Sequence, residues 1–252
     1  MTMTGTLYLI PNTLGADSSE PADPLRSLIP DAVQSITRGL DYFIAENAKT
    51  TRAFLKLLGR QHALARPLQE IDIAELNVNT DSAKLPALLA PLLAGRDAGL
   101  VSEAGVPAVA DPGADLVRLA HLHAIRVRPL VGPSSLLLAL MASGLNGQSF
   151  AFNGYLPTDP VSRSKRIKAL EERSRQDRQT QLFIETPYRN GVLLEALCVA
   201  CQGQTLICVA TDLSLESESV RTQAASQWKA ELAAGRTPNF HKKPTVFLIL
   251  AE

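Results

Sequence analysis

The 252-residue sequence has no long apolar run and no basic leader. A membrane-spanning helix needs about 18 or more unbroken apolar residues, whereas the longest apolar stretch, near residues 136–142, is followed at once by Ser143 and Gly144. The segment from Met1 to Pro11 lacks the basic start and the apolar length of a signal peptide. These absences predict a cytoplasmic protein without a membrane partner.

Cysteine and histidine are too sparse to predict a metal or redox centre. Cys198 and Cys201 form a lone C-x-x-C pair, with no second pair or neighbouring histidine to complete a four-ligand site. Cys198 falls in an apolar helical pattern and Cys208 in an apolar strand, so we expect three buried free thiols. The four histidines are scattered along the chain, and no metal is expected.

The chain also lacks net charge, because 25 basic residues balance 25 acidic ones. No overall field therefore draws it to nucleic acid or to a membrane surface. A glycine-rich dinucleotide loop is missing after the first apolar run, where the sequence reads Pro11-Asn-Thr-Leu-Gly15. This absence disfavours an NAD-dependent oxidoreductase.

Apolar residues make up 46% of the chain, which is enough for real cores. Short apolar runs alternate with longer amphipathic segments, a pattern typical of parallel strands joined by helices. We expect an α/β protein of two domains, with a mainly parallel sheet in residues 1–131 and a second α/β domain in residues 132–252. Residues 14–31, rich in Pro, Ser and Asp, are expected to form a loop. Strands are expected at 6–10, 41–45, 99–101, 125–130, 150–155, 181–185, 205–210 and 245–250.

The segment 101–113 directly follows an apolar strand and reads Val-Ser-Glu-Ala-Gly-Val-Pro-Ala-Val-Ala-Asp-Pro-Gly. In open α/β sheets, ligands bind beyond the carboxyl ends of strands. Gly105 and Gly113 allow backbone conformations that other residues resist. We therefore predict a loop that presents fixed N–H and C=O groups to a small polar ligand. The alternative is a structural connection in which Asp111 caps the following helix.

Two further segments carry weaker signals. Residues 132–135, Gly-Pro-Ser-Ser, gather hydroxyls and free amides at a helix start, where helix capping without a further function is the favoured explanation. Arg163, Lys165, Arg166 and Lys168 form a basic cluster suited to phosphate contacts. Glu171 and Glu172 follow at once, which favours a solvated helix face instead.

Together, segments along nearly the whole chain resemble the tetrapyrrole methylase superfamily of S-adenosylmethionine-dependent methyltransferases. Within it, the sequence is most similar to the 2′-O-ribose methyltransferases of small-subunit ribosomal RNA. The resemblance rests on stretches that occur in the same order: GTLYLIP (5–11), LVSEAGVP (100–107) with DPG (111–113), PLVGPSS (129–135), FNGYLP (152–157) and FIETPYR (183–189).

The resemblance implies two α/β domains with the cofactor in the cleft between them, and a homodimer. It implies backbone contacts to S-adenosylmethionine from Ser102, Ala104, Gly105 and Val106, and places Ser134 and Ser135 near its methionine or sugar end. Leu213, Pro244 and Thr245 would approach the adenosine. Glu185 or Tyr188, at a strand end, would orient or deprotonate the acceptor, although a structural hydrogen bond explains either residue as well.

The sequence departs from the RNA-methylating subgroup at two places. Residues 45–52 read Ala-Glu-Asn-Ala-Lys-Thr-Thr-Arg where the subgroup has an acidic-Asp-Thr-Arg stretch, and residues 212–218 read Asp-Leu-Ser-Leu-Glu-Ser-Glu where it has a Thr-Lys pair. A ribose hydroxyl needs orientation or proton removal before it attacks a methyl group. The alternative is therefore a relative that binds the cofactor but acts on another substrate, or has no catalytic activity.

Overall fold

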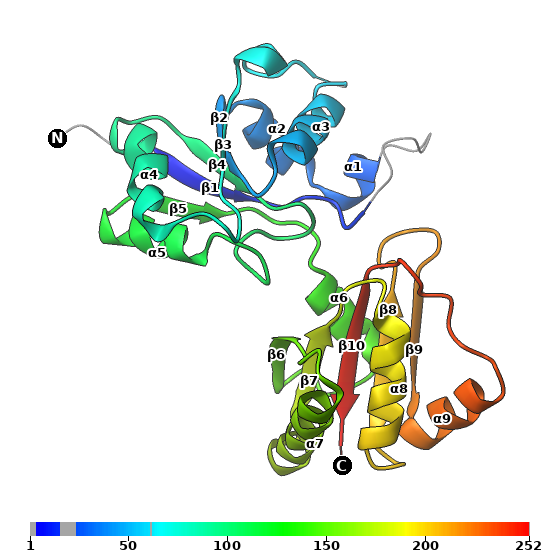
Figure 1. Ribbon diagram of the computed structural model, residues 1–252. Coiled ribbons are helices and arrows are strands. Elements are labelled where there is room, and N and C mark those ends of the chain that lie inside the picture. Colours follow the sequence, from blue (N-terminus) through cyan, green and yellow to red (C-terminus); the bar gives the residue numbers. More distant parts are fainter. Residues whose placement is uncertain (1–3, 16–23, 61, 252) are drawn as a thin grey trace. The chain divides into compact units, whose positions relative to one another are not determined.

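The computed structural model of the protein describes residues 4–15, 24–60 and 62–251. The chain divides into two compact units, Met1–Ser134 and Ser135–Glu252, which run from blue to green and from green to red in Figure 1. The boundary expected from the sequence, after residue 131, lies close to this division. Each unit contains its own five-stranded sheet, so the mixed α/β class expected from the sequence is confirmed.

Unit 1 is a parallel sheet with the strand order β3-β2-β4-β1-β5. Its strands are β1 (Thr6–Ile10), β2 (Tyr42–Ala45), β3 (Asp72–Glu75), β4 (Ala98–Val101) and β5 (Arg126–Pro129). Its helices are α1 (Pro24–Leu28), α2 (Asp31–Arg38), α3 (Ala48–Leu58), α4 (Leu85–Leu93) and α5 (Ala114–Leu122), with the 3-10 turns η1 (Leu68–Glu70) and η2 (Ser82–Lys84).

Helices cover both faces of this sheet, as a parallel sheet requires. On one face, α4 and α5 contribute Leu89 and Leu116 to a core shared with Leu7 and Leu100 of the strands. On the other face, α1, α2 and α3 pack against a second core around Phe43. The two groups of helices lie on opposite sides of the strands in Figure 1. The three inner strands, β2, β4 and β1, are therefore covered on both faces.

The expectation of a loop over residues 14–31 is wrong in part. Residues 24–28 form α1, and α2 begins at Asp31, while residues 16–23 lie outside the described residues. Two strands were also missed: β3 and β9 (Ser219–Ala224). Both are edge strands with mixed polar sequences, so their extended conformation depends on pairing with β2 and β8 (Leu206–Thr211) rather than on local pattern.

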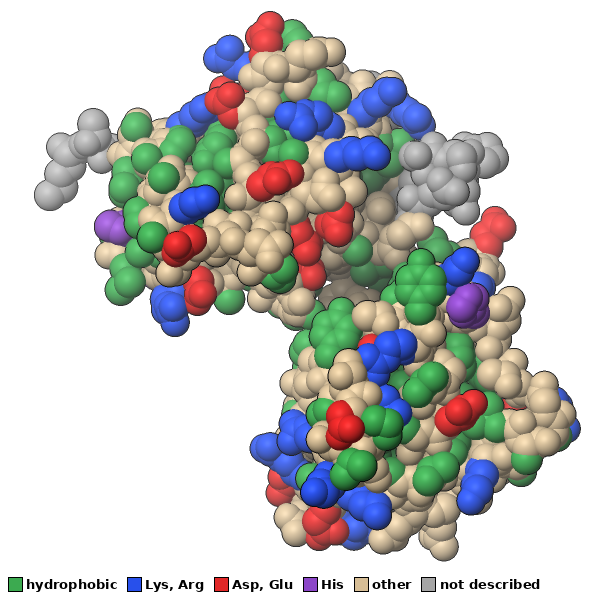
Figure 2. Space-filling model, in the orientation of Figure 1, with side chains coloured by type: hydrophobic (Ala, Val, Ile, Leu, Met, Phe, Trp, Pro, Cys, Tyr) green, Lys and Arg blue, Asp and Glu red, His purple; other side chains and the backbone are tan. Residues whose placement is uncertain are grey.

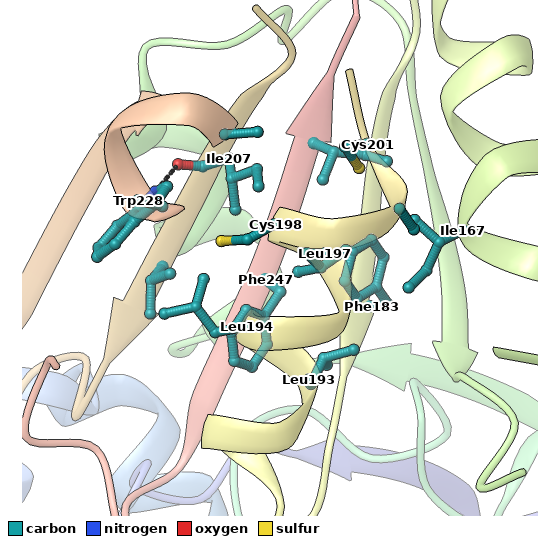
Figure 3. Close-up of a cluster of buried hydrophobic side chains, with 14 of the residues drawn as sticks. Ile167, Phe183, Leu193, Leu194, Leu197, Cys198, Cys201, Ile207, Trp228 and Phe247 are labelled. Atoms are coloured by element: carbon teal, nitrogen blue, oxygen red, sulfur yellow. Dashed lines mark hydrogen bonds between the residues drawn. The ribbon is translucent and has the colours of Figure 1, made fainter. Parts of the chain in front are cut away.

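Unit 2 has the strand order β6-β7-β10-β8-β9, in which only β6 and β7 pair in parallel. Besides β8 and β9, its strands are β6 (Phe150–Tyr155), β7 (Thr180–Ile184) and β10 (Thr245–Leu250). Its helices are α6 (Ser135–Ser143), α7 (Pro160–Asp177), α8 (Asn190–Ala200) and α9 (Ala225–Ala233). Helix α6 contacts β8, β9 and β10, whereas α7, α8 and α9 build the large core drawn in Figure 3.

The core of unit 2 contains the thiols that the sequence placed there. Cys198, Cys201 and Cys208 are free and buried, as expected. Burial raises the pKa of Cys198 to about 11 and that of Cys201 to about 12, so both thiols are protonated and unreactive at neutral pH. In the same core, the indole N–H of Trp228 donates to the Ile207 carbonyl at 2.9 Å (Figure 3).

The expected solvated face of α7 is wrong for two of its residues. Arg163 is buried, and one of its guanidinium nitrogens donates to the Thr158 carbonyl. Glu171 is buried as well, and its carboxylate accepts hydrogen bonds from the Thr205 hydroxyl and the Gln202 N–H. These two charged side chains anchor α7 to neighbouring segments. A four-residue basic surface is therefore not formed.

In the part of the chain that the structure describes, no helix is both long enough and apolar enough to cross a membrane. Within the same residues, no group of three or more His, Cys, Asp or Glu side chains is arranged to hold a metal ion.

Candidate active site

The candidate site of unit 1 lies where β1, β2 and β4 end. In the parallel register, Ile10 pairs with Val101 and Ala45 pairs with Val101, so the carboxyl ends of these strands are level. The segments that follow them leave the sheet at one edge. This is the edge at which open α/β sheets bind ligands, and it carries the loop 102–113 singled out in the sequence.

Asn12 fixes the first part of this loop. Its side-chain amide donates to the carbonyls of Ser102 at 3.2 Å and Glu103 at 3.1 Å. Its backbone N–H donates to the Gly105 carbonyl at 2.7 Å, and the Gly105 N–H donates to Thr13 at 3.3 Å. Asn12 is buried, and these bonds join the segment after β1 to the loop after β4.

The loop backbone adopts conformations that side chains resist. Gly105 has φ = 67°, and the non-glycine residues Ala108 and Ala110 both have φ = 65°. A left-handed residue with a Cβ costs about 1–2 kcal/mol, and such strain persists only where surrounding contacts impose it. The hydrogen bonds of Asn12 and the Ser102 hydroxyl, which donates to the Ala104 carbonyl at 3.1 Å, supply such contacts at the start of the loop.

The segment 132–135 reaches the same place. A Cβ built on Gly132 would lie 2.2 Å from Pro11, so only glycine permits this close approach. A Cβ built on Gly105 would lie 3.7 Å from the Pro133 carbonyl oxygen. The turn after β1, the loop after β4 and the start of the segment after β5 therefore converge within unit 1. Ser134 ends this unit, and Ser135 begins α6.

Three carboxylates surround the loop: Glu46, Glu103 and Asp111. A Glu46 carboxylate oxygen accepts from the Glu103 N–H at 3.1 Å. Partial burial, and then the negative charge of Glu46, raise the pKa of Asp111 to about 6, although hydrogen bonding with Ser102 opposes the shift. Asp111 is not the helix cap that the alternative interpretation required, because the N-cap of α5 is Gly113.

In unit 2, Leu213, Pro244 and Thr245 also lie together. The Asp212 N–H donates to the Pro244 carbonyl at 3.0 Å, and the hydroxyls of Thr211 and Thr245 are 3.2 Å apart. The segment 212–218 contains no lysine, but a lysine just before β10 contacts it. Lys243 Nζ lies 2.7 Å from an Asp212 carboxylate oxygen. The edge where β8 ends and β10 begins therefore carries a paired cation.

Glu185 and Tyr188 occupy the segment after β7 but have different surroundings. Glu185 is buried, forms an ion pair with Arg189 at 3.2 Å and accepts from the Thr186 N–H at 2.8 Å. Tyr188 is 69% exposed, and its ring meets the His241 ring edge-on. The Glu185 carboxylate is thus engaged in local structure, whereas Tyr188 is available to another molecule.

Two curated relatives match most of the chain. The ribosomal RNA small subunit methyltransferase I of Xylella fastidiosa is 32% identical over 220 residues, which are 87% of this chain and 72% of that protein. The protein of the same name from Streptococcus pyogenes serotype M6 is 31% identical over 227 residues, which are 88% and 70% of the two chains. The chain belongs to the ribosomal RNA small subunit methyltransferase I family.

Solved structures share the fold of this methyltransferase. The methyltransferase CobJ matches with a TM-score of 0.61 at 16% identity, covering 98% of this chain and 95% of that one. A cobalt precorrin-4 methyltransferase matches with a TM-score of 0.58 at 13% identity, covering 97% and 94%. No protein-family model matches the chain. The two-domain α/β fold and the tetrapyrrole methylase resemblance inferred from the sequence are both confirmed.

Methyltransferases of this family use S-adenosylmethionine, and the residues of the unit 1 edge suit it. The cofactor carries positive charges on its sulfonium and amino groups, and the edge holds the carboxylates of Glu46, Glu103 and Asp111. Opposite charges attract most strongly where solvent is partly excluded. A phosphate-bearing dinucleotide would meet like charges here, so the chemistry of the edge also disfavours the oxidoreductase alternative.

Sequence reasoning found the three converging segments but missed their main connector. Ser102, Ala104, Gly105 and Val106 all lie in the loop held by Asn12. Asn12 stands in the turn after the first apolar run, but its bonds to Ser102 and Glu103 join distant segments and leave no local signal. No local signal could have revealed the carboxylates around Asp111, because Glu46 comes from the segment after β2.

Asp111→Asn tests the electrostatics of this edge. Because the Asp111 pKa is raised from 3.8 to about 6, the folded state holds more protons than the unfolded state between these values, and stability falls as pH rises through that window. Without cofactor, we expect the variant to gain about 1 kcal/mol of unfolding free energy at neutral pH, a value discounted for solvent screening. Urea unfolding should show the gain disappearing below about pH 4.

Asp115→Asn is the matched control, because that carboxylate is exposed and paired with Arg118 at 2.9 Å. It should show no gain at neutral pH. Equal pH dependence of stability in the wild type and Asp111→Asn would contradict the interpretation.

Proposed function

We propose that this methyltransferase transfers a methyl group to a ribose 2′-hydroxyl of small-subunit ribosomal RNA. The proposal rests on the similarity to the Xylella fastidiosa protein, whose name specifies small-subunit ribosomal RNA. That similarity extends over 87% of this chain and 72% of the relative. The relative's name gives the subunit but no acceptor atom. The choice of the 2′-hydroxyl rests on the resemblance of the motifs to 2′-O-ribose methyltransferases.

In this proposal, the loop of unit 1 binds S-adenosylmethionine through its backbone. Ser102, Ala104, Gly105 and Val106 present groups that are held by Asn12 and by the strained turns after them. Ser134 and Ser135 contact the methionine or sugar end. In unit 2, the adenosine contacts fall to the adjacent residues Leu213, Pro244 and Thr245.

Gly105→Ala tests the loop as a cofactor site. At φ = 67° an added Cβ is strained and meets Leu14 at 3.2 Å, so the backbone should shift away from its binding geometry. We expect S-adenosylmethionine to bind about tenfold more weakly, which corresponds to about 1.4 kcal/mol, as measured by titration calorimetry.

Gly235→Ala is the control for backbone strain, because Gly235 has φ = 71° with no atom within 4 Å of its added Cβ. It should lose stability without losing cofactor affinity. Unchanged affinity in Gly105→Ala would remove this loop from the cofactor site.

Bound S-adenosylmethionine supplies an activated methyl group, so the chain needs to orient the acceptor and exclude water. We assign acceptor contact to the exposed hydroxyl of Tyr188, which can orient the ribose oxygen or take its proton. Glu185 positions this segment through Arg189. The bound cofactor would supply the methyl group, while this segment would hold the acceptor oxygen and its proton would pass to the Tyr188 oxygen or to water.

The decisive experiment incubates small ribosomal subunits that lack the modification with the purified protein and methyl-labelled cofactor. We expect label in one ribose, recognised because a 2′-O-methyl group makes the adjacent phosphodiester resistant to alkali. Tyr188→Phe should lower kcat by about 10²-fold if the hydroxyl transfers the proton, with cofactor affinity unchanged. Tyr155→Phe, at another exposed tyrosine, should retain full activity.

A cofactor-binding relative with another substrate, or without activity, is the second candidate. The departures at residues 45–52 and 212–218 favour it, as does the surface, because basic and acidic side chains are interspersed on the face shown in Figure 2. Cofactor binding without methylation of any ribosomal RNA would select this candidate over the first.

The resemblance also supports a homodimer, and a ribosomal substrate supports a cytoplasmic location. Closed two-fold dimers are the commonest protein assemblies. Light scattering at micromolar concentration should give twice the chain mass of 27.1 kDa. A mass of one chain at every concentration would contradict the dimer without affecting the proposed reaction.

A further inference from the structure

Unit 2 contains a cavity of about 220 Å³ to which the proposed reaction assigns no ligand. It is lined by side chains of β8 and β9 and by residues of the segment before β10. Pockets for drug-sized ligands are about 300–1,000 Å³, so this one takes a single ring system rather than a whole cofactor. Its wall contains Arg221, Trp228, Ser219, Asn239 and Lys243.

The floor of the cavity is an arginine lying on an indole. The guanidinium carbon of Arg221 is 4.9 Å from the centre of the Trp228 ring. Trp228 is completely buried, whereas 43% of the Arg221 side chain remains exposed. Arginine planes stack on aromatic rings, and nucleobases stack on such planes in RNA-binding proteins. This stack offers a flat surface at one side of the cavity.

The charges of the cavity are already neutralised. One Arg221 nitrogen donates to both Glu231 carboxylate oxygens at 2.9 Å, and Lys243 is paired with Asp212 at 2.7 Å. A phosphate would have to compete with both carboxylates for these cations. A neutral planar ligand needs no such exchange, so the pairing favours a base over an anion.

The rim of the cavity contains polar side chains that can form hydrogen bonds with the edge of a base. Ser219 and Asn239 line the cavity, and both residues are exposed. A hydroxyl and an amide supply both donors and acceptors. Val209 and Pro238 add apolar wall, and the combination matches a nucleobase better than a sugar.

We propose that this cavity binds one unpaired nucleobase of the RNA substrate, stacked on Arg221 and hydrogen-bonded by Ser219 and Asn239. The identity of the source as RNA rests on the proposed function, whereas the recognition of a base does not. The cavity would hold the RNA by a splayed base, through stacking and edge hydrogen bonds rather than through phosphate contacts.

Trp228 is the only tryptophan, so its fluorescence lifetime reports on this cavity alone. The full chain is titrated with uridine and with a short oligouridine, at saturating S-adenosylmethionine so that the adenine site is already filled. Ribose and inorganic phosphate are the matched probes without a base. We expect saturable lifetime changes with uridine and oligouridine, and none with ribose or phosphate.

Arg221→Lys keeps the charge beside Glu231 but removes the flat surface. It should weaken uridine binding at least about fivefold, since stacking on a side chain contributes that much or more per base. Asn239→Ala should weaken it by a smaller factor. Arg118→Lys, at an ion-paired arginine in unit 1, is the control and should change nothing. Circular dichroism confirms that each variant is folded.

Three results would overturn the inference. The first is an unchanged lifetime with both base-containing probes, and the second is a response to phosphate alone. The third is a loss of S-adenosylmethionine affinity in Arg221→Lys, which would make the cavity part of the cofactor site. Failure of the proposed function gives a different pattern, because uridine would still bind in an Arg221-dependent way while ribosomal RNA stayed unmethylated. Methylation of ribosomal RNA without any uridine binding would rule out base binding in the cavity and leave the proposed function intact.

Discussion

The hydrogen bonds of Asn12 are the interaction on which the candidate cofactor site depends. They join the segment after β1 to the loop after β4, two strands that are adjacent in space and about 90 residues apart in sequence. The loop contains Ala108 and Ala110 in left-handed conformations, which are stable only where contacts on several sides exclude the alternatives. A fixed backbone spares the chain the entropy of ordering the loop when a ligand binds.

The charge around this loop explains how a neutral chain can still select its ligand. Glu46, Glu103 and Asp111 concentrate negative charge at one edge of unit 1, although acidic and basic residues balance over the whole chain. At the proposed cofactor site, these carboxylates would attract the sulfonium and amino groups of S-adenosylmethionine and would repel an RNA backbone. Attraction of RNA therefore has to come from other residues, or from contacts that do not involve phosphate.

The sequence predicted most central strands because their burial on both faces leaves an uninterrupted apolar run, as in β1 and β10. It failed at β3 and β9, whose polar residues become extended only by pairing with a buried neighbour. The site followed the same rule. Motifs located the converging loops, whereas Asn12 and the carboxylates around Asp111 act through contacts between distant segments, which no local pattern encodes.

The absence of a lysine from residues 212–218 does not by itself remove a cation from this edge. A cation acts through its position in space, and Lys243 places an ammonium 2.7 Å from the Asp212 carboxylate. Asp212 also accepts a hydrogen bond from Ser217 at 2.8 Å, so this carboxylate holds both its own segment and the one before β10. The edge therefore still carries an ammonium group, paired with Asp212, although the segment 212–218 contains no lysine. The missing Thr-Lys pair is therefore only weak evidence against catalysis.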